Sequence, residues 1–366
     1  MNEDCNSETG DAKLTSQNKL YDSDRLTALE ARIAALEESN QALRLILDRE
    51  LQSSNREIIS LKDSFYSKLR LKIESTREKL RPKIGKFHHY PPRVLRVPDT
   101  YDEPPFKGRP PTIAIVTPSY NQAKFIAATV DSVLAQKYPA LNYHVQDAAS
   151  ADGTIDVLKT YNGKISWNST QDPGQAHGLN SGFRSCEGEI MAYLNSDDLL
   201  MPGTLAYVAK AFAADPSLDV VYGHRICIDE QGMEIGRWVL PKHDRTAIRW
   251  FDFVPQETMF WRRRVWEALD GFDEGFDYAI DWDFILRAHA KEMKFVRLPR
   301  FLGCFRVHDK QKTTVRFDVG QEESRRLRLM YLGFEPDDET INRAVSGYLR
   351  RHVIYHRLYK LKIVGY

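Results

Sequence analysis

The hydrophobic positions near the N-terminus recur three and four residues apart. Between residues 26 and 47 leucine or isoleucine occupies each of these positions except one, which is Asn40. This spacing is the heptad seam of a coiled coil, and an asparagine on the seam favours a parallel dimer. An amphipathic helix that folds back on a globular domain is the alternative. We predict a coiled coil over residues 23–80, because the apolar stripe is narrow and no glycine or proline interrupts it before Pro82.

From residue 112 onward short apolar runs alternate with helical patterns. The strand-like runs are TIAIVTPS, NYHVQDA, KISWNS, EIMAYLN and DVVYGH, and the intervening stretches include KFIAATVDSVLAQ. Continuous apolar strands alternating with helices predict an α/β domain whose mostly parallel sheet is covered on both faces. Ligands of such domains bind beyond the carboxyl ends of the strands. We therefore expect the chemistry where these strands end.

Composition divides the rest of the chain. Residues 1–22 are polar and predicted to be disordered, residues 81–111 are a proline-rich linker, residues 112–316 form the α/β domain, and residues 317–366 form a helical tail. The end of the tail has basic residues and no acidic one, interleaved with apolar residues. The basic residues are Arg350, Arg351, Arg357, Lys360 and Lys362. Such a segment suits either an anionic membrane surface or packing on the domain.

The overall composition narrows the class of protein. The chain has 366 residues, 42% hydrophobic residues and a net charge of +1, which is typical of a soluble globular protein. The basic stretch after residue 61 has few interleaved aromatics, which disfavours nucleic-acid binding. The four cysteines lack CxxC spacing, so a zinc cluster or a disulfide-rich secreted fold is disfavoured. The start MNEDCNSETGDAK resembles no secretory signal, and no apolar run approaches the roughly 20 residues of a membrane span. We expect a cytoplasmic protein whose membrane contact is peripheral.

Two adjacent carboxylates follow an apolar run in the stretch YLNSDDLLMPG. They belong to Asp197 and Asp198. Two like charges side by side repel, so a positive group is expected beside them, and a divalent cation with oxygen ligands is the main candidate. The alternative is that the pair caps the next helix, whose first turn suits Pro202.

Polar clusters follow three other strands as well. They are TPSYNQ, QDAASADGT and TQDPGQAHGLNSGF, which begin at residues 117, 146 and 170. Each by itself is compatible with an ordinary turn. Because the carboxyl ends of parallel strands meet at one edge of a sheet, the four clusters together predict a nucleotide site.

The order and content of these motifs resemble family 2 glycosyltransferases of the GT-A fold, over roughly residues 112–314. The opening motif of that family matches TPSYNQAKFIAATVDSVLAQKYP, and its aspartate turn, nucleotide turn and metal motif match QDAASADGT, DPGQAHGLNSGF and LNSDD. Its later acidic and basic motifs match DYAIDWDFILRA and FRVHDKQKT. The resemblance implies a Rossmann-like mixed sheet and a metal-dependent, inverting transfer of a sugar. The donor would be a nucleotide diphosphate sugar, preferably of UDP, and the acceptor a hydroxyl of a glycan or lipid-linked molecule.

Carried over by position, the resemblance also implies roles for single residues. Asp281 would be the catalytic base, with helix capping as the alternative, and a divalent ion, Mn²⁺ or Mg²⁺, would be held by Asp197, Asp198 and His308. The implied donor-binding residues are Thr117, Pro118, Tyr120, Asp147, Asp172, Gln175 and Asp197, and the implied acceptor-binding residues are Gln256, Glu257 and Trp282. A solvated position for His308 and a core position for Trp282 are the alternatives.

The chain departs from the family pattern at two motifs. Ala148 and Ala149 stand where the aspartate turn usually has glycines, so we expect a more ordinary backbone there. Asn195 stands where the metal motif often begins with aspartate, so we expect modest metal affinity. A catalytically inactive scaffold that dimerises through the coiled coil is the competing interpretation, and the retained carboxylates argue against it.

Overall fold

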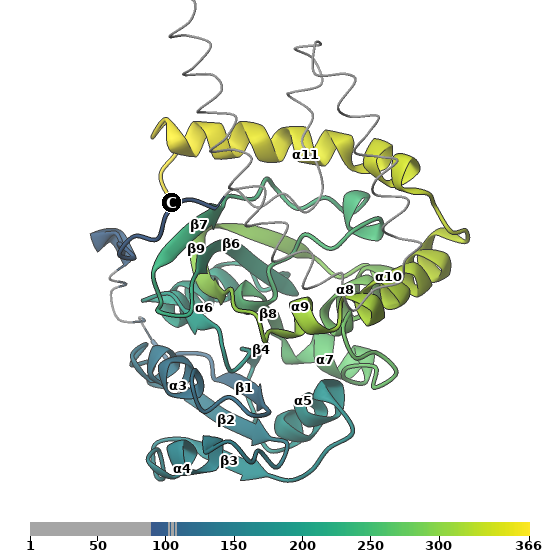
Figure 1. Ribbon diagram of the computed structural model, residues 1–366. Helices are drawn as coiled ribbons and strands as arrows, with labels where there is room; N and C mark the ends of the chain where they lie inside the picture. The colour runs from purple at the N-terminus through teal and green to yellow at the C-terminus, as the bar shows by residue number, and fades with distance from the viewer. Residues whose placement is uncertain (1–88, 102, 104–105, 107) are drawn as a thin grey trace, which may run out of the picture. The chain divides into compact units, whose positions relative to one another are not determined.

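The computed structural model describes residues 89–101, 103, 106 and 108–366 (Figure 1). The predicted disordered segment, the predicted coiled coil and the first part of the predicted linker therefore lie outside the described residues. The boundaries of those segments stay predictions.

A mixed sheet is the centre of the described domain. It has nine strands in the order β3-β2-β1-β4-β8-β6-β9-β5, with β7 paired to β6. The strands are β1 (Ile113–Ser119), β2 (Leu141–Asp147), β3 (Ser166–Ser169), β4 (Ile190–Tyr193), β5 (Leu199–Leu200), β6 (Val220–Ile228), β7 (Glu234–Trp238), β8 (Phe260–Arg262) and β9 (Phe295–Arg306). β1 to β4 run parallel, so their carboxyl ends meet at one edge. The short β8 lies antiparallel between β4 and β6 and brings the preceding loop to that edge.

Helices cover both faces of the sheet, as the continuous apolar strands predict. The helices are α3 (Ile126–Leu134), α4 (Thr154–Lys159), α5 (Gln175–Arg184), α6 (Thr204–Ala214), α7 (Arg263–Leu269), α8 (Ile280–Ala290), α9 (Lys312–Val315), α10 (Phe317–Leu332) and α11 (Asp338–Lys360). Alternate residues of β1 enter different cores: Ile113 and Ile115 pack with α3 and α6, whereas Ala114 and Val116 pack with α5 and α8. This period of two is what a strand buried on both faces requires.

The C-terminal tail is helical, as predicted. The first half of α11 packs on the domain through Ile341, Val345, Tyr348 and Leu349, all of which are buried. The two alternatives for the tail concern the basic segment from Arg350 onward, where Tyr355 and Tyr359 also pack against a buried cluster of the domain. Among the described residues, no helix combines the length and the apolar content that crossing a bilayer requires.

The segment before β1 pairs with β7, the strand that is bonded to β6. Arg93 pairs with Glu234 of β7 through two backbone hydrogen bonds, and the N–H of Tyr90 donates to the carbonyl of Ile235 (2.9 Å). This segment continues into a 3₁₀ turn, η2 (Asp99–Tyr101), whose Tyr101 is buried. Residues 89–101 are thus tied to the same domain as the C-terminal helix.

Candidate active site

The loops after β1 and β2 form one wall of the site. Ser119 lies opposite Asp147 in the strand register, so both loops leave the sheet side by side. The backbone N–H of Asn121 donates to Ser150 Oγ (2.8 Å) and ties the loops together. Tyr120 belongs to the loop after β1 and is 63% exposed. An exposed ring on a fixed loop is a surface on which a planar base can stack.

Asp147 organises the second of these loops. It is fully buried, and its carboxylate accepts hydrogen bonds from Ser150 N–H (2.9 Å), Ser150 Oγ (2.6 Å) and Ser169 Oγ (2.7 Å). Ala149 within this turn has φ +58°, in the left-handed region that glycine favours. The expectation of an ordinary backbone here is therefore wrong at Ala149. The bonds that Asp147 accepts hold the turn, and the alanine bears a strain of about 1–2 kcal/mol.

Two of the predicted donor residues lie differently from Tyr120. Thr117 is fully buried, and its Oγ1 is 3.0 Å from Tyr143 Oη, so its hydroxyl is used inside the domain. Asp172 is partly exposed and accepts the N–H of Gly174 (3.1 Å), and burial raises the pKa of its carboxyl. A Cβ at Gly178 would come within 2.8 Å of Asp172 Oδ2, so a larger residue there would require the Asp172 carboxylate to move.

The two adjacent aspartates face different partners. Asp197 Oδ2 is 2.9 Å from His308 Nε2, and the His308 ring packs on Phe125 with 4.7 Å between ring centroids. Asp198 is buried, and its Oδ1 accepts the backbone N–H of Arg306 (2.9 Å). Burial first, and then the charges of neighbouring carboxylates, raise the pKa of Asp198 well above its usual range. The structure thus brings Asp197 and His308 together and turns Asp198 toward the protein.

The chemistry of this pair fits a hard divalent ion. Asp197 and His308 supply one carboxylate and one imidazole, and the described residues contain no group of three or more His, Cys, Asp or Glu positioned to hold a metal. Mg²⁺ and similar ions are commonly held by one or two carboxylates together with substrate phosphates. Two protein ligands are therefore sufficient if a donor diphosphate completes the site.

A chain of amide hydrogen bonds crosses the site and explains Asn195. Lys312 Nζ donates to Gln175 Oε1 (2.8 Å), Gln175 Nε2 to Asn195 Oδ1 (2.9 Å), Asn195 Nδ2 to Gln256 Oε1 (3.1 Å), and Gln256 Nε2 to the Tyr193 carbonyl (2.7 Å). The ammonium at one end and the carbonyl at the other set the direction of every bond. Position 195 must accept and donate at once, which asparagine can do and an ionised aspartate cannot.

Asp281 lies in the first turn of α8, beyond the N-cap position, which is Ala279. Its Oδ1 accepts the N–H of Trp282 (2.9 Å), and its side chain remains partly exposed. Burial raises the pKa of Asp281, and burial together with the charge of Asp281 raises the pKa of Asp252. A carboxylate with a raised pKa is a stronger proton acceptor. Trp282 is in the core, where its Nε1 donates to the Ile248 carbonyl (2.8 Å).

Glu257 lies at the base of the site within a buried ion pair. Its carboxylate accepts Arg225 Nε (2.7 Å) and Nη2 (2.6 Å), and its side chain is 0% exposed. Its neighbour Gln256 belongs to the amide chain. Tyr193 lies at the end of β4, and burial raises the pKa of its phenol well above its usual range. The charges of nearby carboxylates raise this pKa further, in decreasing order those of Asp281, Asp252, Asp198 and Glu257. These carboxylates therefore gather around one strand end.

Sequence reasoning missed four residues of this arrangement. The sequence motifs assign no role to Lys312, Arg306 and Asp252, and they mark Asn195 only as the loss of a charge. Lys312 lies in the basic motif FRVHDKQKT, so its charge was a usable signal, whereas no local pattern marks Asp252.

The comparisons with known proteins agree with this geometry. Residues 114–266 match the model of the family described as Glycosyl transferase family 2. Residues 114–266 therefore resemble a glycosyltransferase family 2 domain. The chain is 29% identical over 183 residues to a chondroitin synthase of Escherichia coli, a match that covers 49% of this chain and 26% of that protein. It is 30% identical over 184 residues to a hyaluronan synthase of Pasteurella multocida, covering 49% of this chain and 19% of the relative. The match thus spans about a quarter or less of these curated relatives.

The domain also resembles a solved structure, that of S. aureus TarS 1-349 in complex with UDP-GlcNAc. The TM-score is 0.51 at 19% identity, over 69% of this chain and 76% of that chain. This likeness shows the fold. The glycosyltransferase domain therefore has the GT-A architecture that the sequence motifs predict.

Proposed function

We propose that the protein is an inverting, divalent-metal-dependent glycosyltransferase of polysaccharide or glycoconjugate synthesis. The observation that carries this proposal is the gathering of the Asp197–His308 pair, the Asp281 carboxylate and the loops after β1 and β2 at one sheet edge. UDP-sugars are the preferred donors, since TarS was solved with UDP-GlcNAc. The acceptor would be a hydroxyl of a glycan or of a lipid-linked molecule at the cytoplasmic membrane face.

Some side chains of the site would act on the leaving diphosphate, and another would act on the attacking hydroxyl. Asp197 and His308 would hold Mn²⁺ or Mg²⁺, and Asp198 would support the turn through its bond to the Arg306 backbone. A bound ion would neutralise the negative charge of the diphosphate leaving group. The ammonium of Lys312, which donates to Gln175 (2.8 Å) and is paired with Asp277 (3.0 Å), would add a partly compensated positive charge. Asp281 would take the proton of the acceptor hydroxyl while the new C1–O bond forms and the bond to the diphosphate breaks. Attack from the face opposite the leaving group inverts the anomeric centre.

The expected assembly is a homodimer through the coiled coil of residues 23–80. The competing function, an inactive scaffold of a glycan-assembly complex, would keep this dimer and lack turnover. Donor hydrolysis or transfer by the purified protein separates the two functions.

A donor screen tests the proposal. The purified protein is incubated with Mn²⁺ or Mg²⁺, a panel of nucleotide sugars and glycan acceptors, and nucleotide release is measured. We expect release from a UDP-sugar, loss of release on chelation or in Asp197→Ala, and a rate lowered by roughly two to four decades in Asp281→Asn with donor affinity unchanged. Asp156→Asn, an exposed aspartate of α4, is the matched control. Equal rates in Asp281→Asn and the wild type would refute the base, and no turnover of any donor would favour the scaffold.

A further inference from the structure

The outer side of the last turns of α11 is both basic and apolar. Arg350, Ile354, Arg357 and Leu361 are spaced four, three and four residues apart, which places them on one side of a helix. Ile354 is 54% exposed and Leu361 is 70% exposed, and Ile363 just beyond the helix is 65% exposed. Large apolar side chains this exposed, grouped along one stripe, mark an interaction surface.

The inner side of the same turns is held by the domain. Tyr355, Tyr359 and Tyr366 pack against a buried cluster that contains Phe301 of β9. Arg351 is paired with Asp244, whereas no ion pair within the described part of the chain involves Arg350, Arg357, Lys360 or Lys362. The outer stripe is thus a fixed surface with uncompensated positive charge.

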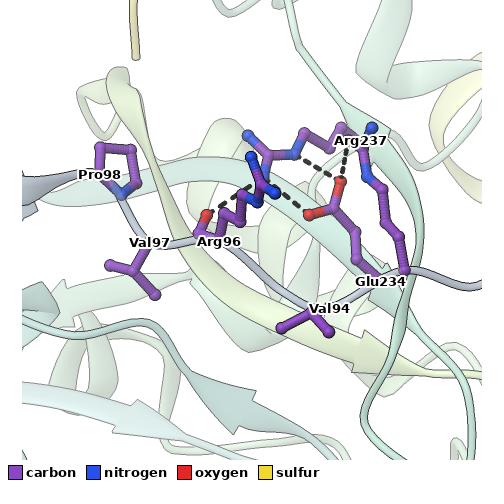
Figure 2. Close-up of a pocket in the computed structure, with 7 residues that line it drawn as sticks. Val94, Arg96, Val97, Pro98, Glu234 and Arg237 are labelled. Atoms are coloured by element: carbon purple, nitrogen blue, oxygen red, sulfur yellow. Dashed lines mark hydrogen bonds and ion pairs between the residues drawn. The ribbon is translucent and has the colours of Figure 1, made fainter.

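The segment before η2 extends this surface. The guanidinium of Arg237 donates to Tyr359 Oη of α11 and also to the carbonyl of Arg96 (3.3 Å), so the two segments lie together. Between this segment and β7 lies a cavity of about 620 Å³, shown in Figure 2. It is lined by Arg93, Val94, Arg96, Val97, Pro98, Glu234 and Arg237. Glu234 is paired with both Arg93 (2.6 Å) and Arg237 (2.7 Å), so three arginines and one glutamate leave a net positive charge. No ion pair within the described part of the chain involves Arg96, and Val94 at the rim is 68% exposed.

We propose that the end of α11 and residues 93–97 together form a docking surface for an anionic phospholipid bilayer. Arginine and lysine meet lipid phosphates, while exposed valine, isoleucine and leucine enter the boundary between headgroups and acyl chains. The cationic cavity offers a place for a single headgroup phosphate. A second copy of the same surface is disfavoured because the two would repel, and a nucleic acid would leave the aliphatic side chains in water.

Vesicle sedimentation of the full-length chain tests this surface. Binding is compared between vesicles of phosphatidylcholine alone and of phosphatidylcholine with phosphatidylglycerol at three to one. The charge variant combines Arg357→Gln, Lys360→Gln and Lys362→Gln, and the apolar variant combines Ile354→Ser, Leu361→Ser and Ile363→Ser. The control variant neutralises three exposed basic residues elsewhere, through Lys159→Gln, Lys164→Gln and Arg184→Gln.

The expected result is binding to the anionic vesicles only. Each basic residue near the surface contributes about fivefold, so the charge variant should lower the partition coefficient on the order of 100-fold. The apolar variant should also bind more weakly but keep its dependence on salt, and the control should bind as the wild type. The proposal is overturned if the charge variant binds like the wild type, which would assign binding to another basic stretch, or if neutral vesicles bind equally well. A changed oligomeric state of either variant in light scattering would overturn it in favour of a second copy.

Discussion

Glu257→Gln tests whether the carboxylate at the base of the site holds the fold or contacts the acceptor. The family resemblance assigns Glu257 to the acceptor site. In the structure both oxygens of its carboxylate accept hydrogen bonds from Arg225 (2.7 and 2.6 Å), and its side chain has no exposed surface. Glutamine keeps the shape and removes the charge. One of the two bonds then places an amide N–H against Arg225 Nη2, and the guanidinium loses its closest anion.

The size of the effect follows from burial. Removing one partner of a buried ion pair costs about 3–5 kcal/mol, because the other charge is left uncompensated. The charge of Glu257 also repels that of Asp198 and helps to raise its pKa. Neutralising Glu257 relieves part of this repulsion, so we expect a loss of stability near the lower end of that range. For a domain of this size a loss of about 3 kcal/mol lowers Tm by roughly 6–12 °C.

Urea denaturation, thermal melting and nucleotide release measure the effect. Glu339→Gln is the matched control, because its partner Arg343 and Glu339 itself are 76% and 83% exposed, and an exposed pair contributes less than about 1 kcal/mol. Replacing both members of the buried pair, with Arg225→Met and Glu257→Leu, should recover most of the lost stability. Wild-type stability of Glu257→Gln with a raised KM for acceptor would refute the reasoning and return Glu257 to the acceptor site.

Three further predictions concern other parts of the domain. Asn195→Asp should lower the free energy of unfolding by about 1–3 kcal/mol and slow nucleotide release, because Gln256 Oε1 loses its hydrogen-bond donor. An unchanged denaturation midpoint would show that the chain of amide hydrogen bonds contributes nothing to stability. Ala149→Gly should raise the free energy of unfolding by about 0.5–1 kcal/mol, because glycine removes the strain at φ +58°. Ala148→Gly, at a position where φ is not positive, should lower it. Equal changes in stability for the two variants would contradict the strain at Ala149. Burial lowers the pKa of His243 to about 3 and that of His289 to about 4, so only the unfolded chain takes up these protons as pH falls below 6.5. The free energy of unfolding should therefore fall by roughly 2–4 kcal/mol between pH 7 and pH 5. If the urea midpoint of His243→Phe falls over this pH range as much as that of the wild type, the loss belongs to other groups.

Several features of this protein follow from local sequence. The apolar runs at residues 113–119 and 190–193 predict strands buried on both faces, because a helix pattern would expose part of each run. The order of the polar clusters after these strands predicts the edge at which the site lies, since parallel strands end together. The helical tail follows in the same way from its periodicity. The coiled coil stays a prediction of this kind.

The direction that each polar side chain takes was decided by tertiary structure. Asp197 and Asp198 are neighbours with the same chemistry, yet one faces His308 and the other the backbone of Arg306, because β9 arrives from more than a hundred residues away. The same holds for Glu257 with Arg225 of β6 and for Asn195 with Gln175 and Gln256. Whether a carboxylate can bind a ligand therefore depends on whether a donor from a distant part of the chain already occupies it. The local hydrophobic periodicity does not specify that donor.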